Sequence, residues 1–145
     1  MTEAARPPHR SKVLVAWLAG LLGVVGAHWW YLGRRGAWAL TVYTVLMLVL
    51  SFTVFDSWWD NPAFLSLNIL FAAGFIESVV FALKPDEAFD ARYNPGSGRV
   101  TRTGWNAVIV AIVSTLLGGI VVVGGIAMTV MYVYMSMGWL DGYVF

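Results

Sequence analysis

Long apolar segments alternate with short polar ones along the whole chain. Four segments are almost free of charged residues: 13–31, 37–55, 63–83 and 105–137. Each is long enough to cross ~30 Å of hydrocarbon as a helix rising 1.5 Å per residue. We therefore predict an all-α integral membrane protein, a four-span helical bundle.

The polar segments define the expected connections. Residues 1–11 form a tail that we expect to be mobile, and residues 33–36 form a tight turn. Residues 56–62 combine two carboxylates, two indoles and a proline, which is typical of a surface loop at a membrane boundary. We interpret 95–104 as a flexible linker and 138–145 as a C-terminal tail that includes Tyr143.

The last apolar segment is longer than a bilayer requires. As one helix, residues 105–137 would measure ~50 Å. It must either project from the membrane or bend near its glycine pairs, Gly118-Gly119 and Gly124-Gly125. Both alternatives stay open at this point.

Composition supports the membrane class. Of 145 residues, 59% are hydrophobic and only 12% are charged, about half the charged fraction of an average soluble domain. A net charge of +1 argues against binding to nucleic acid, which requires a concentrated basic face. The chain has no cysteine, which excludes disulfides and thiolate metal sites, and no cofactor is expected.

The N-terminal region also has features of a secretory signal. Three basic residues, Arg6, Arg10 and Lys12, precede an apolar run, and the small residues 25–27 resemble a cleavage site. The next residues turn directly into another long apolar segment, which favours retention of the segment as the first helix.

Orientation follows from the distribution of basic residues. With four spans, the tail and the 56–62 loop share one side and hold three basic residues. The other side holds six: Arg34, Arg35, Lys84, Arg92, Arg99 and Arg102. The positive-inside rule then predicts that both termini lie outside the cytoplasm of a bacterial inner membrane.

The turn after the first apolar segment is rich in glycine, aromatic and basic residues. Its candidate functional residues are Gly23, Gly26, His28, Tyr31, Gly33, Arg34 and Arg35. His28 is a potential metal or haem ligand, but the only other histidine is His9 in the tail. We therefore interpret His28 as a hydrogen-bonded residue at the membrane boundary, and we expect no metal site.

Two polar residues interrupt the third apolar segment. A charge at this depth usually has a partner or lines a water-filled cavity, so Glu77 is either an ion-responsive site or an anchor between helices. His28 and Arg34 are its candidate partners because the topology places them at the same depth. Asn68 is expected to form a hydrogen bond between helices.

The last apolar segment carries small residues that permit close helix packing. These are Ser114, Gly118, Gly119, Gly124 and Gly125. The helix that approaches them belongs to the chain's own bundle, to an identical subunit in a homo-oligomer, or to a larger membrane protein partner. The lipid bilayer covers the remaining surface.

No motif indicates catalysis. The chain has no G-x-S-x-G, no H-E-x-x-H and no glycine-rich phosphate loop. We therefore expect no catalytic residues and no enzyme activity. The third apolar segment ends at residue 83, and Pro85 followed by two acids predicts a short interfacial helix with Phe89 and Tyr93 on its apolar edge.

Together, Lys12, the turn motif Gly23-x-x-Gly26-x-His28-x-x-Tyr31-Leu32-Gly33, Glu77 and the segment 85–94 resemble the TM-two domain family of small membrane proteins. The resemblance covers residues 12–94 and implies a helical hairpin whose turn lies on the cytoplasmic side. Trp29 stands where the family usually has a basic residue, and the stretch before Glu77 is longer, which leaves room for an extra span. The glycine-rich last helix is an addition to this domain.

The resemblance implies no defined biochemical activity. We expect an accessory or scaffold subunit that assembles through helix contacts. The alternative is a small oligomeric channel, or an ion- or pH-responsive membrane protein, that uses Glu77.

Overall fold

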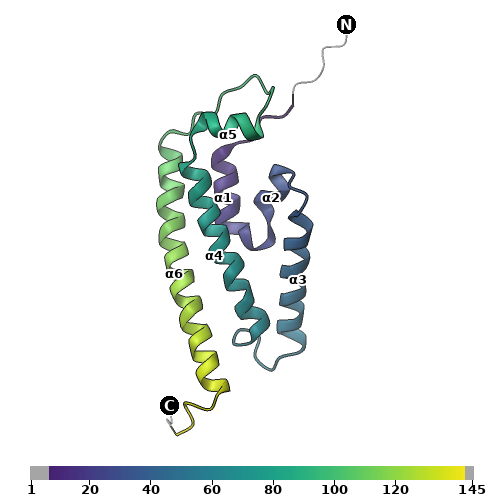
Figure 1. The fold of residues 1–145 in the computed structure, drawn as a ribbon, viewed down its shortest axis with the longest axis vertical. Helices are drawn as coiled ribbons and strands as arrows, with labels where there is room; N and C mark the ends of the chain where they lie inside the picture. Colours follow the sequence, from purple (N-terminus) through teal and green to yellow (C-terminus); the bar gives the residue numbers. More distant parts are fainter. Residues whose placement is uncertain (1–6, 143–145) are drawn as a thin grey trace.

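The computed structural model describes residues 7–142, so residues 1–6 and 143–145 of the two predicted tails, with Arg6 and Tyr143, lie outside it. Its elements are α1 (Lys12–Leu22), the single 3-10 turn η1 (Gly23–Val25), α2 (Ala27–Leu32), α3 (Ala37–Thr53), α4 (Pro62–Leu83), α5 (Asp86–Tyr93) and α6 (Gly104–Ser136). The prediction of an all-helical fold is confirmed for this range. Figure 1 shows an elongated bundle with α5 lying across one end.

The N-terminal apolar segment does not cross the bundle. The prediction of one helix over 13–31 is wrong, because α1 ends at Leu22 and the chain reverses through η1 and Gly26. α2 then runs back toward the end where α1 begins (Figure 1). The backbone N–H of Ser11 donates to the Tyr31 hydroxyl at 3.0 Å, so the two ends of this hairpin meet. We call residues 12–32 the re-entrant hairpin.

Two glycines make the reversal possible. Gly26 has φ of 73°, a left-handed conformation that glycine adopts without steric cost. Gly23 lies against α4 so closely that a Cβ atom there would be 2.6 Å from the Cα of Gly74. Two backbones therefore touch where the hairpin turns, which no larger residue would allow.

Hydroxyl groups of α3 satisfy the carbonyls that the reversal leaves outside helical hydrogen bonding. Thr41 donates to the carbonyl of Val25 at 2.8 Å, and Thr44 donates to that of Val24 at 2.5 Å. Unpaired backbone groups are costly in an apolar setting, so a non-helical turn persists there only when protein groups pair with it. The threonines thus fix the hairpin against α3.

The other apolar segments form helices close to their predicted bounds. α3 and α4 begin and end within two residues of 37–55 and 63–83. The start of α4 follows from its local sequence: Pro62 occupies the first turn, and the Asn61 side chain accepts the N–H of Phe64 at 2.9 Å.

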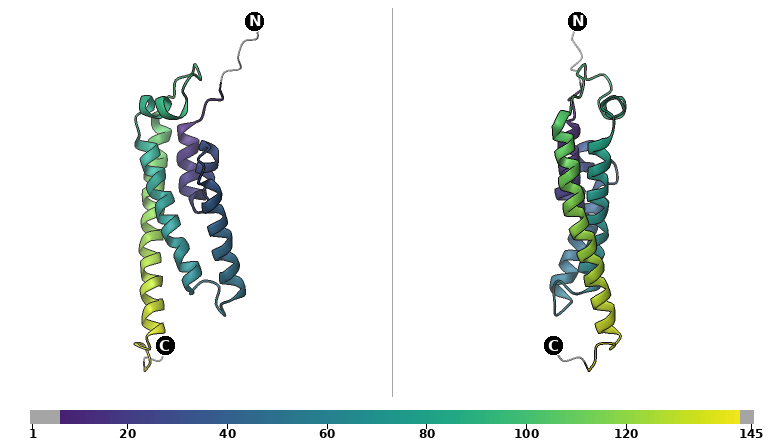
Figure 2. Two further views of the ribbon diagram at one scale, coloured as in Figure 1. Left: turned by 45° about the vertical axis from the view of Figure 1, so that its right-hand side comes forward. Right: turned by 90° about the vertical axis from the view of Figure 1, so that its left-hand side faces the viewer.

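α6 runs unbroken for 33 residues, so the alternative of a bend at the glycine pairs does not occur. It packs along α4 and extends beyond the lower end of α4 (Figures 1 and 2). One glycine of each pair faces α4: a Cβ at Gly118 would lie 2.8 Å from Phe75, and one at Gly125 would lie 3.0 Å from Asn68. The glycines therefore bring two straight helices together.

α4 is the central helix, since α1, α3 and α6 all pack on it. The buried hydroxyl of Ser78 donates to the carbonyl of Ala16 at 2.7 Å and lies 2.7 Å from the Ser114 hydroxyl. The largest buried cluster lies beside this contact and extends under α5. Its members are Val15, Ala16, Ala19, Leu32, Phe81, Ala82, Phe89 and Val110.

By length and composition, α4 and α6 qualify as membrane-crossing helices, with mean hydropathies of 1.9 and 2.6. The helical segment Lys12–Val25 and helix α3 are also apolar, but both are shorter than α4 and α6. Four spans are thus not established, and the two long helices suggest membrane association.

Candidate functional site at the basic end

Glu77 of α4 and His28 of α2 form the centre of the candidate site. His28 is only 2% exposed, and its Nε2 contacts Oε2 of Glu77. The indole N–H of Trp29 donates to the same oxygen at 3.0 Å. The structure therefore contains the His28 contact named as a candidate, and Trp29 is a second partner of the same carboxylate.

Arg34 faces the second oxygen of Glu77. One guanidinium nitrogen lies 3.9 Å from Oε1, and another donates to the Tyr93 hydroxyl at 3.1 Å. The guanidinium also lies 5.1 Å from the centre of the Trp29 ring, within the range of a cation–π contact. Arg34 thus ties the end of α2 to both α4 and α5.

The backbone at Gly33 places Arg34 in this position. Gly33 ends α2 with φ of 69°, and the N–H of Arg34 donates to the carbonyl of Trp29 at 2.9 Å. A left-handed glycine followed by this bond is the common way to end a helix. It folds Arg34 back over Trp29, whereas Arg35 points into solvent.

A second ion pair anchors α5. Lys12 is 3% exposed, and its ammonium lies 2.6 Å from Oδ1 of Asp86 and donates to the carbonyl of Lys84 at 2.6 Å. Burial raises the pKa of Asp86, but the hydrogen bonds from Lys12 and Thr103 lower it more, so this pKa lies below its ordinary value. Asp86 is therefore a charged anchor at neutral pH.

Asp90 holds the segment after α5. The backbone N–H of Thr101 donates to Oδ2 of Asp90 at 2.7 Å, and the Asn94 amide donates to Oδ1 at 2.7 Å. Burial raises the pKa of Asp90, and these bonds outweigh it and lower the pKa below its usual range. The predicted flexible linker 95–104 is thus bonded to α5 at Thr101 and Thr103.

The described part of the N-terminal tail is also fixed. Asn94 accepts the N–H of Arg10 at 2.7 Å and donates to the carbonyl of Arg10 at 3.0 Å. Arg10 and Ser11, which belong to the tail expected to be mobile, are thus bonded to Asn94 just after α5 and to Tyr31 of α2. The tail therefore lies with the 33–36 turn, and the expectation that it shares a side with the 56–62 loop is wrong.

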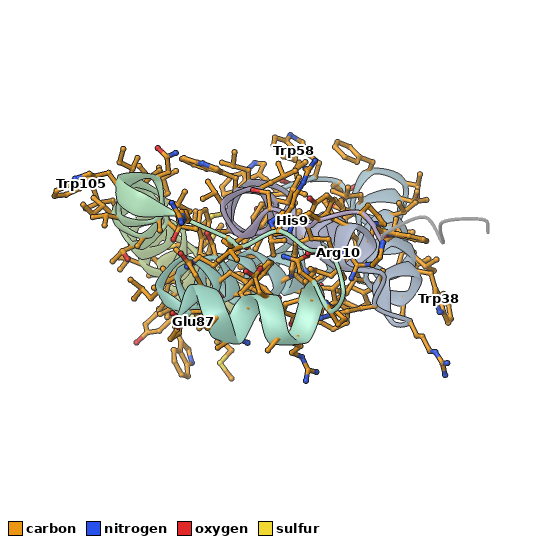
Figure 3. The ribbon with its side chains drawn as sticks, turned by 90° about the horizontal axis from the view of Figure 1, so that it is seen from above. His9, Arg10, Trp38, Trp58, Glu87 and Trp105 are labelled. Carbon is orange, nitrogen blue, oxygen red and sulfur yellow. The ribbon has the colours of Figure 1, made fainter. Side chains whose placement is uncertain are left out.

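This arrangement gathers the basic residues at one end. Of nine lysines and arginines, the eight in residues 7–142 all belong to the tail, the first residue of α1, the 33–36 turn, α5 or the segments that flank α5. Figure 3 looks onto this end, with His9 and Arg10 near its middle and Glu87 on α5. The opposite end carries Asp56, Asp60 and Asp141 and, in the part that is described, no lysine or arginine.

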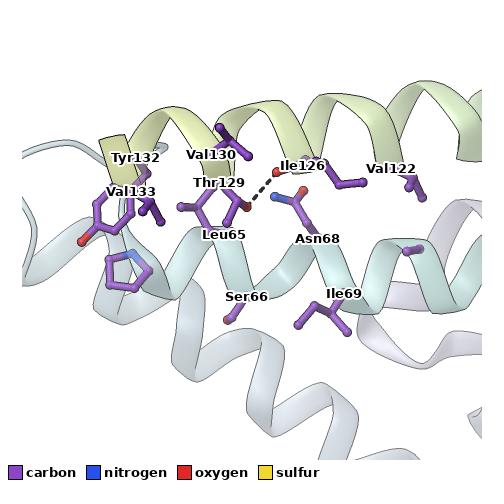
Figure 4. Close-up of a pocket in the computed structure, with 13 residues that line it drawn as sticks. Leu65, Ser66, Asn68, Ile69, Val122, Ile126, Thr129, Val130, Tyr132 and Val133 are labelled. Atoms are coloured by element: carbon purple, nitrogen blue, oxygen red, sulfur yellow. Dashed lines mark hydrogen bonds between the residues drawn. The ribbon is translucent and has the colours of Figure 1, made fainter. Parts of the chain in front are cut away.

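Asn68 does not form the predicted hydrogen bond between helices. Its buried Nδ2 has no partner among the described residues, and its side chain packs on Gly125 (Figure 4). Nδ1 of His28 likewise has no partner in this range.

Asn68 borders an apolar groove between α4 and α6. Two adjoining hollows of about 570 and 380 Å³ share Ala72 and Val122, so they form one continuous groove. Gly119 lines it, whereas Gly124 is exposed away from it. We refer to this feature as the α4–α6 groove.

The four anchoring residues Lys12, Asp86, Asp90 and Asn94 were not predicted as site residues. Asp86 and Asp90 lie one helical turn apart on a short helix, and this spacing is the feature of the sequence that could have indicated an anchoring role for them. Within residues 7–142 no three side chains of histidine, aspartate or glutamate come together as a metal site.

Comparisons with known proteins give no relative. No protein-family model matches the chain, and neither the curated proteins nor the solved structures contain a match. The resemblance to the TM-two domain family therefore stays a prediction that rests on the turn motif and on Glu77.

Proposed function

We propose that this chain is a bacterial inner-membrane protein in which α3, α4 and α6 cross the bilayer and the re-entrant hairpin enters it from one side. α4 and α6 have the required length and hydropathy, and α3 with 17 residues measures ~26 Å. Large apolar side chains such as Ile120 and Val123 are about 70% exposed, as expected of a surface that faces lipid. This arrangement replaces the predicted four spans.

Exposed tryptophans support the same placement. Trp38 and Trp105 lie in the first turns of α3 and α6, and both point away from the bundle (Figure 3). The segments that contain the exposed Trp58, Trp59 and Trp139 lie toward the other end (Figure 1). Indoles prefer the two membrane–water interfaces. The positive-inside rule then assigns the basic end to the cytoplasm. In this orientation the N-terminus is cytoplasmic and the C-terminus is outside, in place of two outside termini.

We infer that the protein acts as an accessory or scaffold subunit that receives a helix of a partner in the α4–α6 groove. The single observation that carries this role is the spacing of the groove walls. On α4 the wall includes Leu65, Ile69, Ala72, Ile76 and Val79. On α6 it includes Thr115, Gly119, Val122, Ile126 and Thr129.

Both walls thus alternate steps of four and three residues. This is the spacing of a coiled-coil seam, and a third helix fits between two such seams. Two small wall residues, Ala72 of α4 and Gly119 of α6, allow the backbone of that helix to approach closely, which is how helices associate in lipid.

The test is a matched pair of variants, Gly119→Leu and Gly124→Leu. A Cβ atom added at either position would meet no atom within 4 Å, so the chain's own bundle tolerates both changes. The complex is extracted gently and its mass is measured by native mass spectrometry. We expect Gly119→Leu to fill the groove and dissociate the complex and Gly124→Leu to preserve it.

The mass of the unmodified complex identifies the partner class. A discrete multiple of the chain mass indicates a homo-oligomer, and co-purification of a larger protein indicates an accessory subunit. A monomer for the unmodified chain contradicts the role. Retention in membranes during alkaline extraction tests the membrane setting separately.

The geometry favours this role over a conducting one. In an oligomeric channel or an ion- or pH-responsive protein, Glu77 would face a path for ions. Its Oε2 instead contacts His28 and Trp29, and its Oε1 faces Arg34. Ion flux in liposomes that Glu77→Gln alters, with the fold intact, would favour the conducting role.

A further inference from the structure

Three basic side chains from three different segments surround Tyr93. Arg34, in the turn after α2, donates to the Tyr93 hydroxyl at 3.1 Å. The ammonium of Lys84, at the end of α4, lies 5.6 Å from the centre of the ring. The guanidinium of Arg92, on α5, lies 5.8 Å from it. We call these four residues the Tyr93 cluster.

The positive charge of this cluster is not balanced by nearby carboxylates. In the described range, neither Lys84 nor Arg92 forms an ion pair, and Arg34 shares Glu77 with His28. Asp86 is paired with Lys12. Lys84 and Arg92 therefore remain available to bind an anion. Beside them, the charge of Arg34 is compensated only in part by Glu77.

The ionisation of the tyrosine reflects the same charge. Burial raises the pKa of Tyr93, but the hydrogen bond and positive charge of Arg34 lower it more, with a contribution from Lys84, so this pKa lies below its ordinary value. A positive potential thus acts at the Tyr93 hydroxyl.

An apolar strip of α4 leads from the membrane to this cluster. Ile76, Val80 and Lys84 follow one another at steps of four residues and share a helix face. Ile76 and Val80 also line the hollow of the α4–α6 groove that lies nearer α5, and they are 63% and 58% exposed, so an acyl chain has access to them where a partner helix leaves this end of the groove open. In the proposed orientation, Lys84 lies where this strip meets the cytoplasmic headgroups.

We propose that Lys84 and Arg92, together with Arg34 and Tyr93, bind the phosphate of an anionic lipid of the cytoplasmic leaflet. Guanidinium and ammonium groups are the usual donors to phosphate oxygens, and basic pockets at the cytoplasmic ends of membrane helices bind anionic headgroups. A zwitterionic lipid carries its own cation, which the surplus positive charge of the cluster repels. The inference rests on the proposed membrane setting.

The test compares lipids that differ only in the headgroup. The full chain is purified in a neutral detergent, and retention of phosphatidylglycerol or of phosphatidylcholine with the same acyl chains is measured by native mass spectrometry. We expect selective retention of phosphatidylglycerol. Lys84→Gln combined with Arg92→Gln should weaken it about thirtyfold, since each basic residue near a membrane surface contributes roughly a factor of five.

The matched control is Arg99→Gln combined with Arg102→Gln, which removes the same charge from exposed residues of the same end. It should change retention less than about twofold. The charge-preserving pair Lys84→Arg with Arg92→Lys should retain the lipid, and circular dichroism checks that each variant is folded. An equal loss in both glutamine pairs, or no loss in either, overturns the site.

Free glycerol phosphate distinguishes the source of the phosphate. If it displaces phosphatidylglycerol at equal concentration, the ligand is a soluble phosphate and the lipid assignment is wrong. A chain that withstands alkaline extraction but shows no headgroup preference contradicts the site alone. A chain released by that extraction contradicts the membrane setting itself.

Discussion

The contact between Gly23 and Gly74 provides the sharpest test of the re-entrant hairpin. We consider the substitution Gly74→Ala, which adds one carbon atom to the middle of α4. That carbon would lie 2.7 Å from the carbonyl oxygen of Ala19 and 3.0 Å from the Cα of Gly23. Both neighbours are backbone atoms, so no side-chain rotation relieves the overlap.

The size of the effect follows from these distances. Ordinary contact begins at 3.4 Å, so the hairpin must move by about 0.7 Å away from α4. Overpacking of this kind costs roughly 1–3 kcal/mol. The matched control is Gly124→Ala in α6, where the added carbon meets nothing within 4 Å. Both substitutions replace a helical glycine by alanine and gain the same helix propensity, about 0.5–1 kcal/mol. The difference between the free energies of unfolding of the two variants therefore isolates the packing cost of Gly74→Ala.

The free energy of unfolding is measured by titrating mixed micelles with sodium dodecyl sulfate and following helicity by circular dichroism. We expect Gly74→Ala to be less stable than Gly124→Ala by about 1–3 kcal/mol. Equal stabilities within about 0.5 kcal/mol would refute the close contact and, with it, the position of the hairpin turn against α4.

Three further measurements address other parts of the fold. Because the chain has no cysteine, single cysteines report topology cleanly: Pro8→Cys and Arg35→Cys should react with an impermeant reagent from one side, and Asp56→Cys from the other. Thr44→Val keeps the side-chain shape but leaves a carbonyl of the hairpin unpaired, so detergent titration should give a loss of about 1 kcal/mol. The lowered pKa of Asp86 means that its anchoring of α5 is complete above pH ~4 and is lost as pH falls through the folded-state pKa. Amide exchange in α5 should therefore accelerate in acid, and Asp86→Asn should reduce this dependence to the part that Asp90 contributes.

Local features of the sequence were sufficient for the positions of α3, α4 and α6. Long apolar runs set their lengths, and Asn61 and Pro62 mark the start of α4 through chemistry that involves adjacent residues only. The short helix α5 was also predictable, because Pro85 and the acids after it act within one turn.

The re-entrant hairpin was not predictable in this way. Hydropathy reports that residues 13–31 are apolar, but it does not report the direction of the chain. The reversal depends on Gly74 and on the threonines of α3, which lie about 16 to 51 residues further along the sequence. The predicted orientation rests on the same assumption, namely that the first segment crosses the membrane.

The candidate site was predictable only in part. Similar depth in the membrane was enough to name His28 and Arg34 as partners of Glu77. The pairs Lys12–Asp86 and Arg10–Asn94 require the tail to lie beside α5, which follows only from the hairpin. The groove glycines illustrate a further limit, because composition does not distinguish Gly118, which packs on Phe75, from Gly119, which faces outward.

The hairpin also imposes an order on biosynthesis. Its turn is complete only when Thr41 and Thr44 donate to it and Gly74 lies against Gly23. Gly74 is synthesised 51 residues after Gly23, which at 5–20 residues per second is a delay of roughly 3–10 s. In the proposed orientation the nascent hairpin waits at the cytoplasmic face during this interval, and α3 is the first segment that the insertion machinery moves across the bilayer. The N-terminal tail therefore never has to be translocated, and the earliest apolar segment of the chain is among the last to reach its final position.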